Sequence, residues 1–176
     1  DENTVSELIG PAPDKTSRGH IVRRLIHLTT VDEVAVFLEE ATLKEFRPFT
    51  LLAIDPGLEA RRWTWMGDDG ELTIDSPVPP VASSAFRTRE VLKTRRRTYE
   101  KMVREQGNVD SKLLKKYHSS HIPERGPFSV CMHRSDGKTQ SMSRIVVTGD
   151  IVRFFYTPGN PCTTPSDSAV ELSRRK

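Results

Sequence analysis

The sequence predicts an α+β fold with antiparallel strands. Its segments follow the order helix, helix, three strands, a fourth short strand, helix, helix and three strands, so strands come in groups instead of alternating with helices. Such grouping is typical of antiparallel sheets, arranged as two sheets or as one large sheet covered by helices. The sequence has neither a G-x-G-x-x-G fingerprint nor a phosphate-binding loop, which disfavours a doubly wound nucleotide-binding fold.

Two short helices are predicted near the N-terminus, after an irregular lead-in over residues 1–16. Residues 17–28 place aliphatic side chains on one helical face. Thr30 and Glu33 have the spacing of a capping box, in which each side chain accepts a hydrogen bond from the other residue's backbone N–H. Apolar residues continue at helical spacing as far as Ala41, so the second helix is predicted to begin directly after Thr30.

The following segments change to the periodicity of strands. Residues 49–54 have the pattern of a buried strand, and residues 61–66 alternate around two tryptophans. Residues 71–74 follow after the turn sequence Gly67–Gly70, which is typical of a tight connection between two strands. These three segments predict an antiparallel meander. The short apolar run over residues 81–84 is predicted to be a strand or a strand end.

The second half repeats the order of helices and strands. A long helix is predicted over residues 88–105, and Asp110 is placed to cap another helix. Three further strands are predicted over residues 128–134, 139–147 and 151–156. The whole is expected to form a single domain over residues 17–157, followed by a flexible tail over residues 158–176.

The composition excludes several classes of protein. The longest apolar stretch of this 176-residue chain is far shorter than the roughly 20 residues that a membrane-spanning helix needs. Two cysteines are too few for a disulfide scaffold and are expected to be reduced thiols in a cytoplasmic protein. The net charge of +3 includes one dense basic cluster, Lys93–Arg97, typical either of a solvated helix face or of a phosphate contact. Because only Tyr99 accompanies this cluster, nucleic acid is a disfavoured partner.

A group of nitrogen and sulfur donors is the clearest candidate for a metal site. His118 and His121 are three residues apart, and Cys131 and His133 follow, so the four could form a tetrahedral zinc site. Against this, Cys131 and His133 share one face of a predicted strand, where an inward cysteine is often an ordinary core residue. The Cys-x-His spacing is also poorer than the loops typical of structural zinc sites. The expectation is therefore that the protein holds no metal or other cofactor.

Nucleophilic catalysis has only weak support from the residues themselves. No Gly-x-Ser-x-Gly elbow is present, and Ser83-Ser84, just before a predicted helix, comes nearest to one. The same serines could equally accept hydrogen bonds from the free N–H groups at the helix entry. Cys131 is expected to be buried within a strand and inert.

Several short motifs, in this order and spacing, resemble the NRDE family, which includes the transport-and-Golgi-organisation proteins and many bacterial relatives. The resemblance covers roughly residues 16–162. Its motifs are Ser17-Arg18-Gly19, the strand Phe49–Ile54, the turn Gly67–Gly70, Ser83-Ser84 with Arg87, His118-Ser-Ser-His121, Pro123–Pro127, Ser129–Arg134, Thr139-x-Ser141 and the hairpin to Tyr156. The resemblance implies the N-terminal-nucleophile hydrolase fold, a four-layer α/β/β/α sandwich of antiparallel sheets.

The family's chemistry depends on a cysteine at the start of the chain, which attacks a non-peptide amide while its own α-amino group acts as the base. The present sequence begins at Asp1 and enters the pattern partway, so this cysteine and the first strands of the sandwich are expected to be missing from it. The resemblance implies a supporting role at the oxyanion pocket for Ser84 and Arg87, and substrate binding by Arg134 and Thr139.

Two functions are expected from this resemblance. The first is a cysteine-type amidohydrolase, which would be an enzyme only if an N-terminal cysteine segment exists. The alternative is a non-catalytic protein of the same fold that binds or traffics a haem or lipid-like ligand, with His118, His121 or Cys131 as iron ligands. The expected partners are a small molecule and, through exposed sheet edges, a second copy or a missing N-terminal segment.

Overall fold

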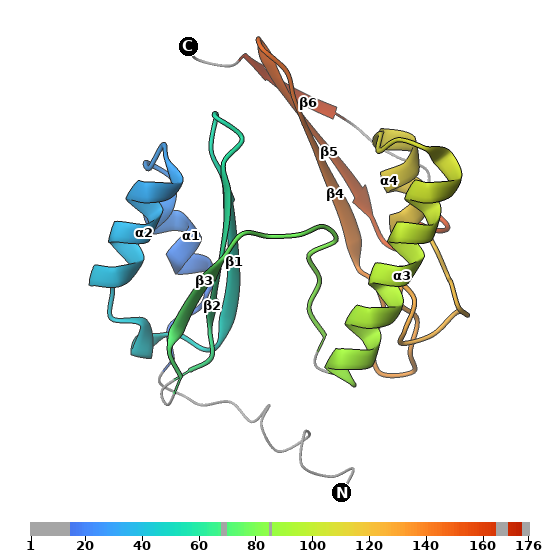
Figure 1. Cartoon of the computed structure of the whole chain (residues 1–176), viewed down its shortest axis with the longest axis horizontal. Coiled ribbons are helices and arrows are strands. Elements are labelled where there is room, and N and C mark those ends of the chain that lie inside the picture. Colours follow the sequence, from blue (N-terminus) through green and yellow to red (C-terminus); the bar gives the residue numbers. More distant parts are fainter. Residues whose placement is uncertain (1–14, 68–69, 85, 165–168, 174–176) are drawn as a thin grey trace, which may run out of the picture. The chain divides into compact units, whose positions relative to one another are not determined.

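The computed structural model of the protein describes residues 15–67, 70–84, 86–164 and 169–173 (Figure 1). The chain divides into two compact units, called here the N-terminal unit (Asp1–Val81) and the C-terminal unit (Ala82–Lys176), where the sequence predicts one domain over residues 17–157. Each unit contains helices and an antiparallel three-stranded sheet, so the α+β class is confirmed. Of the predicted lead-in, residues 1–14 lie outside the described residues.

The N-terminal unit begins with two helices, α1 (Gly19–Leu25) and α2 (Val31–Glu40). The predicted capping box is confirmed: the Glu33 N–H donates to Thr30 Oγ1 over 3.2 Å, and the Glu33 carboxylate accepts from the Thr30 N–H over 3.1 Å. The Thr29 N–H donates to the same carboxylate over 2.6 Å, and this bond is the main cause of the lowered pKa of Glu33. Local hydrogen bonds therefore fix the start of α2.

Replacing Thr30 by Ala should destabilise the N-terminal unit by about 1 kcal/mol, because the Glu33 N–H loses its acceptor at the helix start. The folded-state pKa of Glu33 lies below its unfolded value, so its stabilising effect is lost as the pH falls through the folded pKa. Urea denaturation at neutral pH and in acid, followed by tryptophan fluorescence, measures both effects. Thr30→Ser keeps the acceptor, and a loss as large as that of Thr30→Ala would contradict the capping role.

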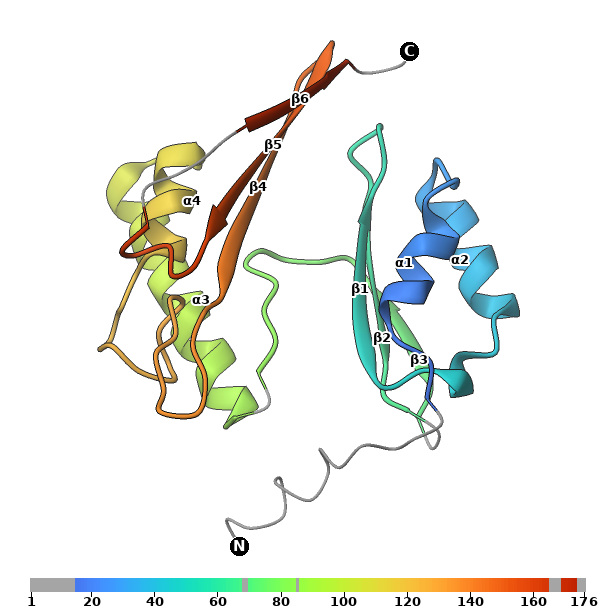
Figure 2. The same ribbon diagram turned by 180° about the vertical axis from the view of Figure 1, so that it is seen from behind.

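Three strands form the predicted meander: β1 (Phe49–Ile54), β2 (Ala60–Trp65) and β3 (Leu72–Asp75). The central strand is β2, and pairing places Trp63 between Leu51 and Ile74. Both helices lie on the same face of this sheet, as Figure 2 shows from behind. The core of the unit is a cluster of buried apolar side chains between helices and sheet: Ile21, Val31, Val34, Leu38, Leu43, Phe46, Trp63 and Trp65.

The C-terminal unit begins with the helices α3 (Thr88–Gln106) and α4 (Ser111–His118), followed by the strands β4 (Ser141–Val147), β5 (Ile151–Pro158) and β6 (Ala169–Ser173). The predicted cap of α4 is confirmed, since Asp110 accepts a hydrogen bond from the Leu113 N–H over 2.7 Å. The sheet order is β4-β5-β6, and all pairs are antiparallel. The described apolar cluster between the two helices is small and contains the buried side chains of Met102, Leu113 and Tyr117.

The long connection between α4 and β4 differs from the prediction. The strand predicted over residues 128–134 is wrong, because its backbone groups bond to turns and side chains instead of to a ladder. The Cys131 N–H donates to the Ser120 carbonyl over 3.0 Å, and the Met132 N–H donates to Thr139 Oγ1 over 2.9 Å. Residues 119–140 consequently contain no helix or extended strand.

Two other segments also differ from the prediction. Residues 81–84 precede α3 without forming a strand. Residues 158–176 are predicted to be a flexible tail, and their described part includes the turn around Cys162 and the strand β6, which pairs with β5. In the described part of the chain, no helix is long and apolar enough to cross a membrane.

Candidate metal centre

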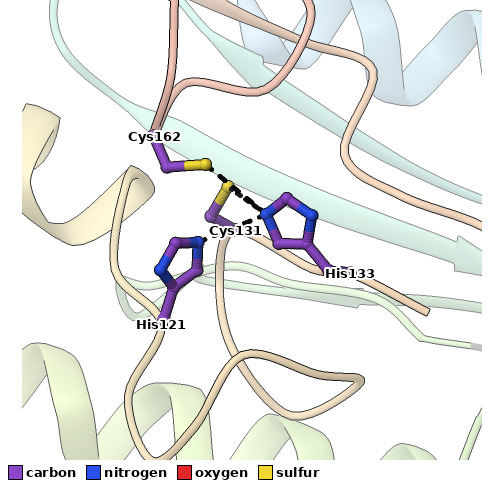
Figure 3. A group of neighbouring side chains, drawn as sticks. All are labelled: His121, Cys131, His133 and Cys162. Carbon is purple, nitrogen blue, oxygen red and sulfur yellow. Dashed lines mark hydrogen bonds between the residues drawn. The ribbon is translucent and has the colours of Figure 1, made fainter.

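Four side chains from distant parts of the C-terminal unit converge on one point (Figure 3). They are His121, Cys131, His133 and Cys162, and their ligand atoms all lie within 4.8 Å of one another. Nε2 of His133 lies 3.2 Å from Nε2 of His121, 3.5 Å from Sγ of Cys131 and 3.4 Å from Sγ of Cys162. We call this group the four-donor cluster.

The three distances from His133 Nε2 match three edges of a zinc tetrahedron. With Zn–N bonds of about 2.05 Å and Zn–S bonds of about 2.3 Å, tetrahedral angles place two nitrogens about 3.3 Å apart and a nitrogen and a sulfur about 3.6 Å apart. The observed nitrogen–nitrogen distance is 3.2 Å, and the nitrogen–sulfur distances are 3.5 and 3.4 Å. The other three pairs of ligand atoms lie within 4.8 Å of each other, so one ion could contact all four atoms after side-chain movement.

The Cys-x-His pair is held in place by a tight turn. Sγ of Cys131 lies 3.5 Å from Nε2 of His133, so the two side chains point toward each other on the same side of the chain. The turn is closed by the Arg134 N–H, which donates to the Gly137 carbonyl over 2.8 Å, and by an antiparallel bridge between His133 and Lys138. The Cys-x-His spacing is shorter than that of typical zinc loops, but this turn places the two ligands side by side.

The other two ligands come from the end of α4 and from the turn after β5. His121 follows α4 by three residues, where the Ser120 hydroxyl accepts a hydrogen bond from the Ile122 N–H over 3.1 Å. Ser119 Oγ donates to the Pro161 carbonyl over 3.0 Å, which ties the end of α4 to the residue before Cys162. These bonds connect segments that are far apart in the sequence, so the cluster depends on tertiary structure.

The protonation states of the cluster suit metal binding in one respect and oppose it in another. Burial, Arg125 and the neighbouring His121 lower the pKa of His133, which favours the neutral ring that a metal requires. An Arg125 guanidinium nitrogen lies 3.4 Å from His133 Nδ1. Burial raises the pKa of the Cys131 thiol to about 11, so a metal ion must displace its proton to bind.

Cysteine and histidine can bind a single metal ion, an iron–sulfur cluster or haem, and the geometry of the four-donor cluster favours a single ion. In a Rieske-type [2Fe–2S] cluster, cysteines and histidines bind different irons, whereas here one histidine nitrogen contacts both sulfurs. Haem is disfavoured at this point, because four converging donors leave no room for a porphyrin between them. Four protein ligands of mixed nitrogen and sulfur type are typical of a closed, structural zinc site.

The structure brings together three of the four predicted metal ligands. His121, Cys131 and His133 lie in the cluster, whereas the His118 ring lies edge-on against Tyr117, with ring centroids 5.2 Å apart, and outside it. Sequence reasoning missed Cys162, which is 29 residues from His133 in the chain. The one available signal was that the second cysteine of the chain follows the last predicted strand.

The residues expected to support an amidase pocket have local partners. Ser84 Oγ donates to the Phe86 carbonyl over 2.8 Å, which is a helix-entry contact, and Thr139 Oγ1 accepts from the Met132 N–H. Arg87 pairs with Glu90 at 3.1 Å and Arg134 pairs with Asp136. The two arginines also meet one aromatic pair: Arg87 lies over Phe128, Arg134 lies over Phe86, and the rings contact each other edge to face. The structure thus brings Arg87 and Arg134 to the same aromatic pair.

Comparisons of the chain with family models, with curated proteins and with solved structures found no match.

Proposed function

We propose that the C-terminal unit is a zinc-binding module, in which His121, Cys131, His133 and Cys162 hold one Zn²⁺ ion. The observation that carries this proposal is the agreement between the distances around His133 Nε2 and the edges of a zinc tetrahedron. Two cysteines and two histidines fill all four positions, so no ligand position stays open for a substrate. The ion would therefore have a structural role.

The architecture of the unit supports a structural role. Its described buried apolar cluster has three members, against eight in the N-terminal unit. Residues 119–140 form a long connection without regular structure, and irregular connections of this length are uncommon in compact domains. A metal ion would link this connection to the turn after β5, which supplies the cross-link that small cores often need.

The purified 176-residue chain, expressed in zinc-containing medium, should contain one zinc ion per molecule by elemental analysis. Replacement of zinc by Co²⁺ should give the sulfur-to-cobalt charge-transfer and visible bands of a tetrahedral thiolate site. His133→Ala should lower the zinc affinity at least a hundredfold, because His133 is the ligand that contacts the other three.

His27→Ala is the matched control, since His27 is an exposed histidine in the segment after α1. It should leave the zinc content at one ion per molecule. A wild-type protein without zinc that also fails to bind added Co²⁺ would overturn the proposal, as would a His133→Ala variant with unchanged affinity.

The sandwich fold that the NRDE resemblance implies is a second proposal. It is supported by an exposed apolar face on the C-terminal sheet, since a large apolar patch usually marks a surface that another element covers. The exposed apolar side chains of this face are Ile145, Val147, Phe154, Tyr156, Val170 and Leu172. The amidohydrolase activity, the haem or lipid-like ligand and a homo-oligomer stay predictions.

A further inference from the structure

Building on the proposed zinc site, we propose that Cys131 and Cys162 form a redox pair through which a peroxide releases the metal. Oxidation would join the two sulfurs in a disulfide and leave only the two histidines as ligands. The unit would then be held together by all four residues through zinc when reduced, and by Cys131 and Cys162 through a covalent bond when oxidised.

The two sulfurs are close enough to react. Each lies within 3.5 Å of the same nitrogen, His133 Nε2, and their mutual separation is within 4.8 Å. A disulfide requires a sulfur–sulfur bond of about 2.05 Å, so the two side chains must move toward each other as the bond forms. The chain has two cysteines, so no other intramolecular disulfide competes.

The two cysteines differ in exposure, which sets the order of events. Cys131 is fully buried, with 0% of its surface exposed, whereas Cys162 is half-buried in the turn after β5. Oxidation by a solute follows access as well as thiolate character. Cys162 is therefore the sulfur that meets the peroxide, and Cys131 is the resolving sulfur behind it.

The chemistry balances in two steps. The Cys162 thiolate attacks one peroxide oxygen, the O–O bond breaks, and Cys162 becomes a sulfenic acid while the alkoxide or hydroxide takes up a proton. The Cys131 thiolate then attacks the Cys162 sulfur, the S–S bond forms, and hydroxide leaves and is protonated to water. Overall, one Zn²⁺ ion with its two thiolates, one peroxide and two protons give one disulfide, one alcohol or water, one further water and free Zn²⁺.

The loss of both thiolates explains why the metal leaves. The thiolates carry the two negative charges that neutralise Zn²⁺, and a disulfide sulfur is neutral and does not replace them. His121 and His133 remain, but two neutral nitrogen ligands bind the ion far more weakly than four ligands. The pair of histidines therefore does not retain zinc at low free concentration.

The test uses the zinc-loaded full chain and hydrogen peroxide, with a chromophoric zinc indicator and mass spectrometry of the unreduced tryptic digest. The zinc content before oxidation tests the metal site, and a chain that holds no zinc overturns that site. For zinc-loaded protein, we expect one zinc released for each Cys131–Cys162 linked peptide formed, with zinc binding restored by a dithiol reductant.

Met132→Leu is the matched control, because Met132 lies between the two ligands and is itself oxidisable. It should release zinc with the same dependence on peroxide as the wild type. Three results would overturn the redox pair: zinc retained after the thiols are oxidised, zinc released without the linked peptide, or a Met132→Leu chain that no longer releases zinc.

Discussion

Removing zinc should unfold the C-terminal unit and leave the N-terminal unit folded. A ligand that binds only the folded state stabilises it by an amount set by its free concentration relative to Kd. At a thousandfold excess over Kd this is about 4 kcal/mol. The described apolar cluster of the C-terminal unit has only three buried members. The unit therefore has little other stabilisation to offset the loss of bound zinc. The N-terminal unit supplies none of the four ligands, so its stability should not change.

The positions of the aromatic residues allow the two units to be followed separately. Both tryptophans of the chain, Trp63 and Trp65, lie in β2 of the N-terminal unit. The rings of Tyr99 in α3 and Tyr117 in α4 contact each other edge to face, with ring centroids 5.3 Å apart. On titration with a strong chelator, the tyrosine circular dichroism should be lost while the tryptophan fluorescence stays native. An unchanged tyrosine signal in zinc-free protein would contradict a structural role for the ion.

Local patterns were enough to predict most of the helices and strands. The capping box at Thr30 and the Asp110 cap involve residues three apart, so the sequence contains all the information they need. The meander of β1 to β3 follows from alternation and from a turn of a few residues. These elements are confirmed because their stabilising contacts are close in sequence.

The segment around the Cys-x-His pair shows where this reasoning fails. Ser129-Val-Cys-Met-His133 alternates like a strand, but among the described residues its only strand-like pairing is the isolated bridge from His133 to Lys138. Its hydrogen bonds go instead to Ser120 at the end of α4 and to Thr139. Alternation predicts which side chains lie on the same side of the chain, and Cys131 and His133 do lie on the same side. The alternating pattern does not predict whether another strand is available for pairing.

The cluster itself could be predicted only in part, for the same reason. Three of its residues lie between positions 121 and 133, so a local search finds them. The fourth, Cys162, reaches the site only because β4 and β5 form a hairpin and Ser119 bonds to the Pro161 carbonyl. His118, one turn back from His121 in the sequence, was favoured by spacing alone and lies outside the group.

Trp63→Ala should be the most damaging single change in the N-terminal unit, with a loss of about 3–5 kcal/mol. The side chain is 0% exposed and lies at the centre of β2, between β1 and β3 and against the helices. Its truncation leaves a cavity that the sheet cannot fill without moving strands on both sides. Trp65 remains as the fluorescent reporter for urea denaturation, and the zinc content of the C-terminal unit should be unchanged.

The two tryptophans differ in the hydrogen bonding of their indole nitrogens, so their replacement by Phe distinguishes the effect of packing from that of hydrogen bonding. Among the described residues, Trp63 Nε1 is buried without a partner, whereas Trp65 Nε1 donates to the Phe46 carbonyl over 3.4 Å. An unpaired buried N–H costs about 1–3 kcal/mol, so Trp63→Phe removes this penalty together with some packing. Trp65→Phe removes a satisfied bond as well as packing. We therefore expect Trp63→Phe to cost less than Trp65→Phe, and the opposite order would mean that Trp63 Nε1 has a partner in solution.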